Sequence, residues 1–158
     1  METIFLGNEL AADLISLIAS AEKSISIFCY QFTPLASSTS ARHRPLLEAV
    51  MAAPKRGLQC RILLATMRGT HAYTIANKQA ATQLLQSGWQ VRMGAQVPLQ
   101  HAKSWLFDGT SSLIGSHNLT EAAMQKNIEA SIYTDSPTIC ARLANEFNRV
   151  WEKSTPAN

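Results

Sequence analysis

Residues 101–118 read HAKSWLFDGTSSLIGSHN, and this stretch has the pattern of a β-hairpin. Polar and apolar residues alternate over 100–107, as they do along a half-buried strand. A second short run, 111–115, is its expected partner across the turn at 108–110. The hairpin predicts a β-sheet with at least one antiparallel pair of strands.

On both sides of this hairpin, helical patterns alternate with short strand-like runs. Strands are expected at residues 24–32, 58–65, 89–93 and 128–134, and helices at 8–21, 45–53, 73–87, 120–125 and from Pro137 onward, after Ser136. Such alternation predicts an α/β fold, a layered domain with a mixed β-sheet flanked by helices.

The length and composition fit one domain. The chain has 158 residues, of which 46% are hydrophobic, so residues 1–158 are expected to share one core, with 155–158 as a frayed tail. No apolar run reaches the roughly 18 to 20 residues that a membrane-spanning helix needs, so no membrane span is expected. The first residues have no basic segment before their apolar stretch, which argues against an ordinary signal peptide.

Three cysteines, Cys29, Cys60 and Cys140, cannot all pair within one chain, and none has the spacing of a zinc site. We expect them to be reduced and buried, because free cysteine is among the most frequently buried residue types. Reduced cysteines are typical of a cytoplasmic protein, which is the predicted location. A reactive thiol is the alternative.

Basic residues are concentrated in the middle of the chain. The net charge is only +3, but no carboxylate lies between Glu48 and Asp108. That stretch holds seven cations: Lys55, Arg56, Arg61, Arg68, Lys78, Arg92 and Lys103. Clustered Lys and Arg attract anionic partners, so the stretch predicts a surface or groove for phosphate groups. Scattered, solvated charges are the alternative.

The polar residues of the hairpin suit the chemistry of phosphate esters. Side chains two apart on a strand share a face, which places His101 and Lys103 about 6.8 Å apart, where one phosphate can contact both. An imidazole can attack phosphorus or donate a proton, and a fixed ammonium group stabilises charge on the non-bridging oxygens. Ser116 and Asn118 add hydroxyl and amide donors, and Gly115 permits close backbone approach.

The order His-x-Lys-x4-Asp-x6-Gly-Ser-x-Asn within residues 101–118 resembles the signature of the phospholipase D superfamily at all six positions. Three further features, Tyr30-Gln31-Phe32, Arg56-Gly57 and Glu129, fall where small bacterial members of that superfamily carry them. The resemblance covers nearly the whole chain and implies a phospholipase D-like layered fold. Most relatives carry two copies of the motif and this chain carries one, so it is similar to the nuclease branch, in which two chains assemble one active site.

This resemblance implies a metal-independent phosphodiesterase or endonuclease that acts on DNA or RNA in a site shared by a homodimer. One His101 would attack phosphorus to give a phosphohistidine, and the second would protonate the leaving oxygen, because one imidazole cannot readily do both in a single in-line step. Lys103, Asn118 and Ser116 would bind the phosphate. No cofactor is expected, since Lys103 supplies the positive charge and no carboxylate cluster or His/Cys spacing suits a metal.

Two acidic residues have expected roles near this chemistry. Glu129, within an otherwise apolar strand, is the candidate for holding the imidazole N–H and fixing its tautomer, with an exposed edge carboxylate as the alternative. Asp108 falls on the opposite face from His101, so it is expected to orient the hairpin or to make a dimer contact.

Several other residues are expected to be structural. His117 occupies the variable position of the motif, and Trp105 is expected in the core rather than as a platform for a base. His43 and His71 are expected to be solvated loop residues.

Two other functions stay open on the sequence alone. A phospholipase D-type lipid phosphodiesterase is the rival enzyme, although the basic stretch favours a polyanion over a lipid. The third possibility is a catalytically degenerate nucleic-acid-binding module, which the intact His101, Lys103, Asn118 and Glu129 disfavour.

Overall fold

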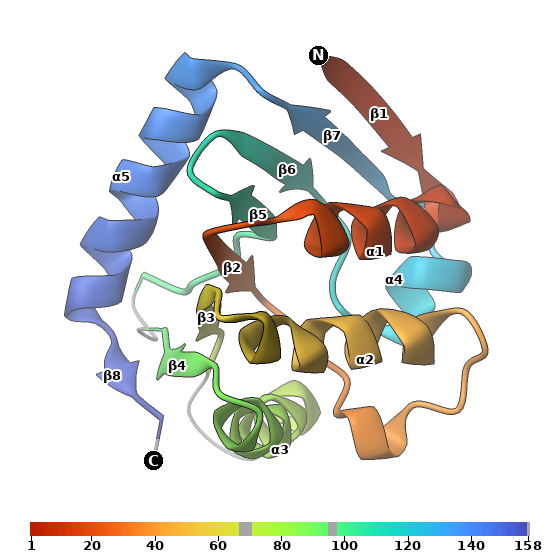
Figure 1. Ribbon diagram of the computed structural model, residues 1–158. Helices are drawn as coiled ribbons and strands as arrows, with labels where there is room; N and C mark the ends of the chain where they lie inside the picture. Colours follow the sequence, from red (N-terminus) through yellow and green to blue (C-terminus); the bar gives the residue numbers. More distant parts are fainter. Residues whose placement is uncertain (67–70, 95–97, 158) are drawn as a thin grey trace.

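The computed structural model describes residues 1–66, 71–94 and 98–157, and within them the chain forms one eight-stranded sheet with five α-helices (Figure 1). The strands are β1 (Glu2–Leu6), β2 (Ser24–Cys29), β3 (Gln59–Leu64), β4 (Gln90–Met93), β5 (Ser104–Phe107), β6 (Ser111–Gly115), β7 (Ala130–Thr134) and β8 (Thr155–Pro156). The helices are α1 (Leu10–Ser20), α2 (His43–Ala52), α3 (Ala72–Gln86), α4 (Glu121–Gln125) and α5 (Pro137–Lys153), with short 3-10 helices η1 (Gly7–Glu9), η2 (Leu35–Ser37) and η3 (Ala53–Arg56). The predicted α/β fold with a mixed, helix-flanked sheet is confirmed.

The strands lie in the order β1-β7-β6-β5-β2-β3-β4-β8. β2, β3 and β4 are parallel, and the other neighbouring pairs are antiparallel. Parallel neighbours need crossover connections, which α2 and α3 provide. The expected hairpin is present, because β5 and β6 pair across the turn at 108–110.

Helices cover the two faces of the sheet unequally. On β2, Ile27 belongs to a large core that includes side chains of α1, α2, α3 and α4, whereas Phe28 packs with Leu63 of β3 and Phe147 of α5. Consecutive strand residues point to opposite faces. Among the described helices, α1 to α4 therefore pack on one face and α5 stands alone on the other; Figure 1 shows α1 and α2 in front of the strands and α5 along one side.

A short strand, β8, lies within the stretch 155–158 that was expected to be a frayed tail. β8 pairs antiparallel with β4. The Arg92 guanidinium donates to the carbonyl oxygens of Trp151 (2.7 Å) and Ser154 (3.1 Å), which directs the chain back along β4. Residue 158 lies outside the described part of the chain.

The strand expected at 100–107 starts only at Ser104, the first residue of β5. Gln100 is buried and its side-chain amide donates to the carbonyl oxygen of Leu63 (3.3 Å), which holds this segment against β3 instead of in a ladder. His101 and Lys103 consequently lie on irregular backbone directly before β5.

His43 is the first residue of α2 and is fully buried, not a solvated loop residue as expected. Its Nδ1 lies 3.0 Å from the Ser38 hydroxyl, and its backbone N–H donates to the Ser40 hydroxyl (3.1 Å). Burial lowers the pKa of His43 and favours the neutral ring. The Ser-rich loop before α2 thus supplies buried hydrogen bonds that the loop's composition did not indicate.

All three cysteines are free and buried, as predicted. Burial raises the pKa of Cys29 to about 12 and that of Cys60 to about 11, so both thiols stay protonated at neutral pH. Trp105 is also buried in the larger core, as expected.

Candidate active site

His101 and Lys103 lie in direct contact at the end of the segment that leads into β5. The Lys103 Nζ is 3.3 Å from Nε2 and 3.4 Å from Nδ1 of the imidazole, and it donates to the His101 carbonyl oxygen at 2.7 Å. His101 is exposed and Lys103 is half-buried. The proximity that a strand geometry predicted is therefore present, although it occurs on irregular backbone before the strand begins.

Tyr30, which directly follows β2, supports both residues. Its ring centroid lies 4.4 Å from the centroid of the His101 ring and 4.6 Å from the Lys103 Nζ. The face of a tyrosine ring attracts a cation, so Tyr30 fixes the ammonium group beside the imidazole. In the sequence, Tyr30 stands out only because its position resembles that in the phospholipase D superfamily. Its contact with His101 and Lys103 was not predicted.

Partial burial lowers the pKa of Lys103 below its ordinary value. Burial disfavours the charged ammonium form, and an anion bound next to it would favour that form. The site is thus suited to an anionic group at the Lys103 Nζ.

Gly115, at the end of β6, permits the close approach that holds Lys103 in place. Its backbone N–H donates to the Lys103 carbonyl oxygen at 3.2 Å. A Cβ at this position would lie within 2.5 Å of the Ser131 Cα and would also collide with the Ala130 carbonyl oxygen. Only glycine fits here, because β7 passes directly against the Gly115 Cα.

Ser116 and Glu129 bind each other rather than the imidazole of the same chain. The buried Glu129 carboxylate accepts hydrogen bonds from the Ser116 hydroxyl and from Asn127 Nδ2 (3.0 Å). The Ser116 oxygen also accepts from the Ala130 backbone N–H (3.1 Å). Within the described residues, Glu129 makes no hydrogen bond to His101, and the Ser116 hydroxyl already donates its proton to Glu129. Both residues lie at the wall of the site.

Asn118 joins the motif to the segment after β2. Its Oδ1 accepts from the Gln31 backbone N–H (3.2 Å), and the Leu119 N–H donates to the Gln31 carbonyl oxygen (3.0 Å). With its oxygen occupied in this way, the Asn118 side chain retains its amide NH₂ as a donor toward the site.

Asp108 lies in the hairpin turn, away from the site, and holds the entry to β2. Its carboxylate accepts from the backbone N–H groups of Glu22 (2.9 Å), Lys23 (2.7 Å) and Ser24 (2.8 Å). Burial alone would raise its pKa, but these N–H donors outweigh burial and hold the pKa below its ordinary value. These contacts are within one chain and are those of a residue that orients the hairpin.

His117 is buried and connects three parts of the fold. Its Nε2 lies 2.8 Å from the Gly7 carbonyl oxygen and its Nδ1 lies 2.7 Å from the Ser131 hydroxyl. A carbonyl oxygen only accepts, so Nε2 carries the proton and donates it. His117 therefore fastens the end of β1, a strand that the sequence did not predict, to β7.

The site residues open into one cavity of about 590 Å³. It is lined by Tyr30, His101, Ala102, Lys103, Ser104, Ile114, Gly115, Ser116, Asn118, Glu129 and Leu143. Six of the seven residues singled out in the motif region meet here, and Asp108 is the exception. Lys103 is the only Lys or Arg among these lining residues.

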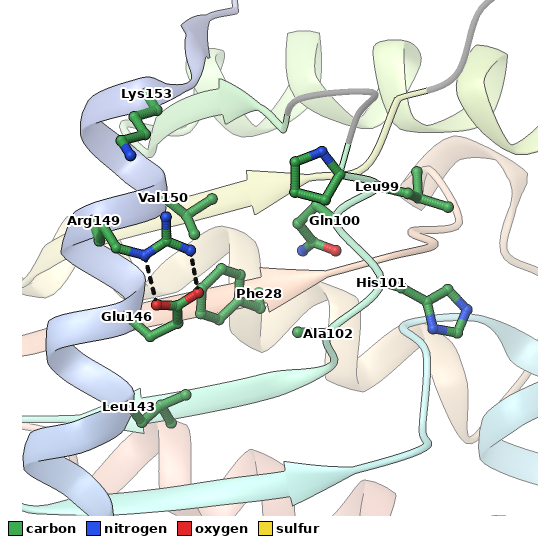
Figure 2. Close-up of a pocket in the computed structure, with 11 residues that line it drawn as sticks. Phe28, Leu99, Gln100, His101, Ala102, Leu143, Glu146, Arg149, Val150 and Lys153 are labelled. Carbon is green, nitrogen blue, oxygen red and sulfur yellow. Dashed lines mark hydrogen bonds and ion pairs between the residues drawn. The ribbon is translucent and has the colours of Figure 1, made fainter.

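A second cavity of about 470 Å³ adjoins the first at His101, Ala102 and Leu143. Figure 2 shows Leu143 and Val150 of α5 and Phe28 of β2 on its walls, with His101 at one edge. At its rim the Arg149 guanidinium pairs with the Glu146 carboxylate at 2.6 and 2.8 Å. A mostly apolar hollow thus lies beside the imidazole.

Three of the cations in the basic stretch make contacts within the fold and do not line the cavity that holds His101. Arg56 donates to the carbonyl oxygens of Ile18 and Ala21 at the end of α1. Arg61 stacks over Phe147 at 5.1 Å, and Arg92 holds the turn into β8. Lys55 and Lys78 are exposed. Arg68 lies outside the described residues. The seven cations counted in the sequence therefore do not all contribute to a basic surface around the site.

Within residues 1–66, 71–94 and 98–157, no group of three or more His, Cys, Asp or Glu side chains is placed to hold a metal ion. No helix in that part of the chain is both long enough and apolar enough to cross a membrane.

A family model described as "Cardiolipin synthase, PLD-like domain" matches residues 14–151. The chain belongs to the phospholipase D superfamily. A mitochondrial cardiolipin hydrolase of Danio rerio is 30% identical over 147 residues, which cover 92% of this chain and 58% of that protein. The chain thus spans less than two thirds of that relative's length.

Two solved structures share the fold of this phospholipase D-like chain over its whole length. Nuc from Salmonella typhimurium, a phospholipase D family member, superposes with a TM-score of 0.79 at 26% identity, covering 99% of this chain and 98% of its own. NucT from Helicobacter pylori superposes with a TM-score of 0.77 at 20% identity, covering 99% and 98%. The expected superfamily and its layered fold are confirmed.

Proposed function

We propose that this chain is a metal-independent phosphodiesterase that cleaves DNA or RNA through a phosphohistidine, in a site shared by two copies of the chain. The observation that carries the proposal is the contact of His101 with Lys103 over the Tyr30 ring, at the mouth of one cavity. A nucleophilic imidazole and a fixed cation at one point are what attack on a phosphodiester requires.

The reaction proceeds in two displacements. An imidazole nitrogen of one His101 attacks phosphorus, a P–N bond forms, and the P–O bond to the leaving group breaks as the second His101 protonates that oxygen. The second His101, now neutral, takes a proton from water, whose oxygen attacks phosphorus and breaks the P–N bond. Lys103 and the Asn118 amide stabilise the charge on the non-bridging oxygens.

In this mechanism the second imidazole comes from another copy of the chain. His43 and His117 are buried and hydrogen-bonded within the fold. His71 stacks on Tyr73, which in turn contacts Tyr30, so two rings separate it from His101. A two-fold axis beside the site would supply a second His101 and a second Lys103 together.

Incubation with single-stranded DNA, duplex DNA, RNA and bis(p-nitrophenyl) phosphate in excess EDTA tests the proposal. We expect cleavage of a nucleic acid and of the chromogenic diester with no loss of rate in EDTA, because Lys103 supplies the positive charge. His101→Ala should abolish turnover, and acid-labile phosphate should be trapped on the wild-type protein. Rate loss in EDTA that Mg²⁺ restores would contradict the metal-independent mechanism.

A lipid phosphodiesterase is the second candidate. The apolar cavity that adjoins His101 could hold an acyl chain, and a relative in Danio rerio is named mitochondrial cardiolipin hydrolase. The same incubation with cardiolipin and phosphatidylcholine vesicles separates the two functions. Cleavage of lipid without cleavage of any nucleic acid would reverse the ranking.

A further inference from the structure

The segment that carries Tyr30 is held by a helix that lies outside the motif. β2 ends at Cys29, so the backbone of residues 30–32 leaves the ladder of that strand. Backbone N–H and C=O groups that leave a ladder need other hydrogen-bond partners. One partner is Asn118 of the motif, which binds the middle of the segment, and the other is Asn77 of α3.

Asn77 is 0% exposed and makes three hydrogen bonds to backbone groups. Its Oδ1 accepts from the Phe32 N–H (2.9 Å), and its Nδ2 donates to the carbonyl oxygens of Tyr30 and Ala65 (2.8 Å each). A buried amide side chain costs free energy unless its polar atoms are paired, and here the oxygen and the nitrogen both have partners. Since Ala65 directly follows β3, Asn77 fixes α3 to the ends of β2 and β3.

The same face of α3 makes a second contact with Tyr30, through the ring of Tyr73. Tyr73 lies four residues before Asn77, and side chains four apart on a helix share a face. The ring centroids of Tyr73 and Tyr30 are 5.0 Å apart, with the ring planes inclined by 41°. Aromatic rings at such a separation attract each other beyond the effect of burial. α3 thus holds Tyr30 by its backbone and by its ring.

Tyr73 is placed to support the site and not to react in it. It is not among the described residues that line the cavity holding His101 and Lys103. Burial raises the pKa of Tyr73 to about 12, so its hydroxyl stays protonated at neutral pH and does not act as a base. Its ring contacts are with Tyr30 and His71. An effect of Tyr73 on turnover would therefore be transmitted by Tyr30.

We propose that Tyr73 is a positioning residue of the active site, and that it acts through the Tyr30 ring on the placement of the Lys103 ammonium beside the His101 imidazole. The inference rests on the proposed function, in which Lys103 stabilises charge on the phosphate. The Lys103 Nζ lies 4.6 Å from the Tyr30 ring centroid and 3.3 Å from the imidazole Nε2. A Tyr30 ring that loses its neighbour on α3 is free to tilt, and the ammonium then loses its fixed place.

Steady-state hydrolysis of bis(p-nitrophenyl) phosphate by Tyr73→Leu tests the inference. We expect kcat to fall about 5-fold, the rate equivalent of one aromatic pair, with little change in KM, because Tyr73 touches no substrate. Tyr73→Phe keeps the ring and should retain nearly the wild-type kcat. The matched control is Tyr133→Leu. Tyr133 is also half-buried, but it lies on β7 and packs against the larger core, so its loss should leave kcat unchanged.

A double variant separates positioning from a general loss of stability. In a Tyr30→Leu background, Tyr73→Leu should change kcat by less than about 2-fold, because no Tyr30 ring is left to position. Equal fold-losses in the two backgrounds would overturn the inference. An unchanged kcat in Tyr73→Leu, or an equal loss in Tyr133→Leu, would do the same.

Circular dichroism checks that each variant folds, and Tyr73→Met, with its adaptable side chain, serves in place of Tyr73→Leu if the latter does not. The failure of this inference differs from that of the proposed function. A wild type that hydrolyses no diester overturns both, whereas an active wild type with any of the contrary results above overturns the role of Tyr73 alone.

Discussion

Tyr30 contributes to the site without belonging to the motif. Its ring lies against both His101 and Lys103, and Asn118 and Leu119 hold the segment that follows β2 next to the motif. The motif predicted a set of residues that the fold gathers around one cavity, since their types and spacing are those of a site for phosphate chemistry. It could not predict the aromatic support, because Tyr30 is far away in the sequence and a tyrosine at a strand end has many possible contacts.

Replacing Tyr30 with leucine should lower kcat for the chromogenic diester about 10-fold, the equivalent of one cation–π contact of about 1.4 kcal/mol. Without the ring the Lys103 ammonium loses its position beside the imidazole. Tyr30→Phe keeps the ring face and should retain most of the activity. Steady-state kinetics of both variants are the measurement, and equal losses in the two would show that the hydroxyl, not the ring face, is responsible.

Asp108 should stabilise the fold in a pH-dependent way. Its pKa is held below the ordinary aspartate value of about 3.9, so its contribution is complete above that value and declines as pH falls through the lowered pKa of the folded state. Asp108→Asn should cost about 1–3 kcal/mol at pH 7, because its NH₂ group would face a backbone N–H donor.

Urea unfolding of the wild type and of Asp108→Asn at a series of pH values measures the difference in their free energy of unfolding. The difference between them should shrink below about pH 3.9, where a protonated aspartate resembles asparagine. A difference that stays constant from pH 7 to pH 3 would mean that the charge of Asp108 is not what stabilises the turn.

At the scale of elements, the buried strands were predictable and the edge strands were not. β2 and β3 are short runs rich in β-branched and other apolar residues and are bounded by breaks in the pattern, which is typical of buried strands. β1 and β8 are held by tertiary contacts, such as that of His117 with Gly7 and those of Arg92 with the turn before β8. Such contacts leave no periodic signal. The late start of β5 has a similar cause, since the buried Gln100 amide competes with the ladder.

The approach of β7 to β6 at Gly115 should be intolerant of any side chain. Gly115→Ala would place a Cβ against the Ser131 Cα and the Ala130 carbonyl oxygen, so we expect a loss of about 1–3 kcal/mol and a displaced Lys103. Ser131→Ala should not rescue it, because the collision with the backbone persists. Thermal unfolding of the single and double variants is the measurement, and full rescue by Ser131→Ala would locate the collision in the hydroxyl alone.

At the scale of the whole molecule, the number of basic residues predicted the functional surface less well than the spacing of the motif residues did. The run of cations without a carboxylate suggested a groove, yet Arg56, Arg61 and Arg92 are used to bind carbonyl oxygens and aromatic rings within the fold. A charge total does not distinguish a structural arginine from one that meets a ligand. The motif spacing does convey position, because a hairpin with fixed ends brings His101, Lys103 and Asn118 to one cavity.

If the site is shared, its activity should depend on how subunits are combined. Co-refolding wild-type chains with His101→Ala chains at a fixed total concentration gives mixed dimers that hold only one imidazole. With both imidazoles required, activity should follow the square of the wild-type fraction, so an equal mixture would keep about a quarter of the activity. Independent sites would keep about half, in proportion to the wild-type fraction. Because Lys103 and Tyr30 stay intact in both kinds of chain, the difference between these two curves reports on the second imidazole alone.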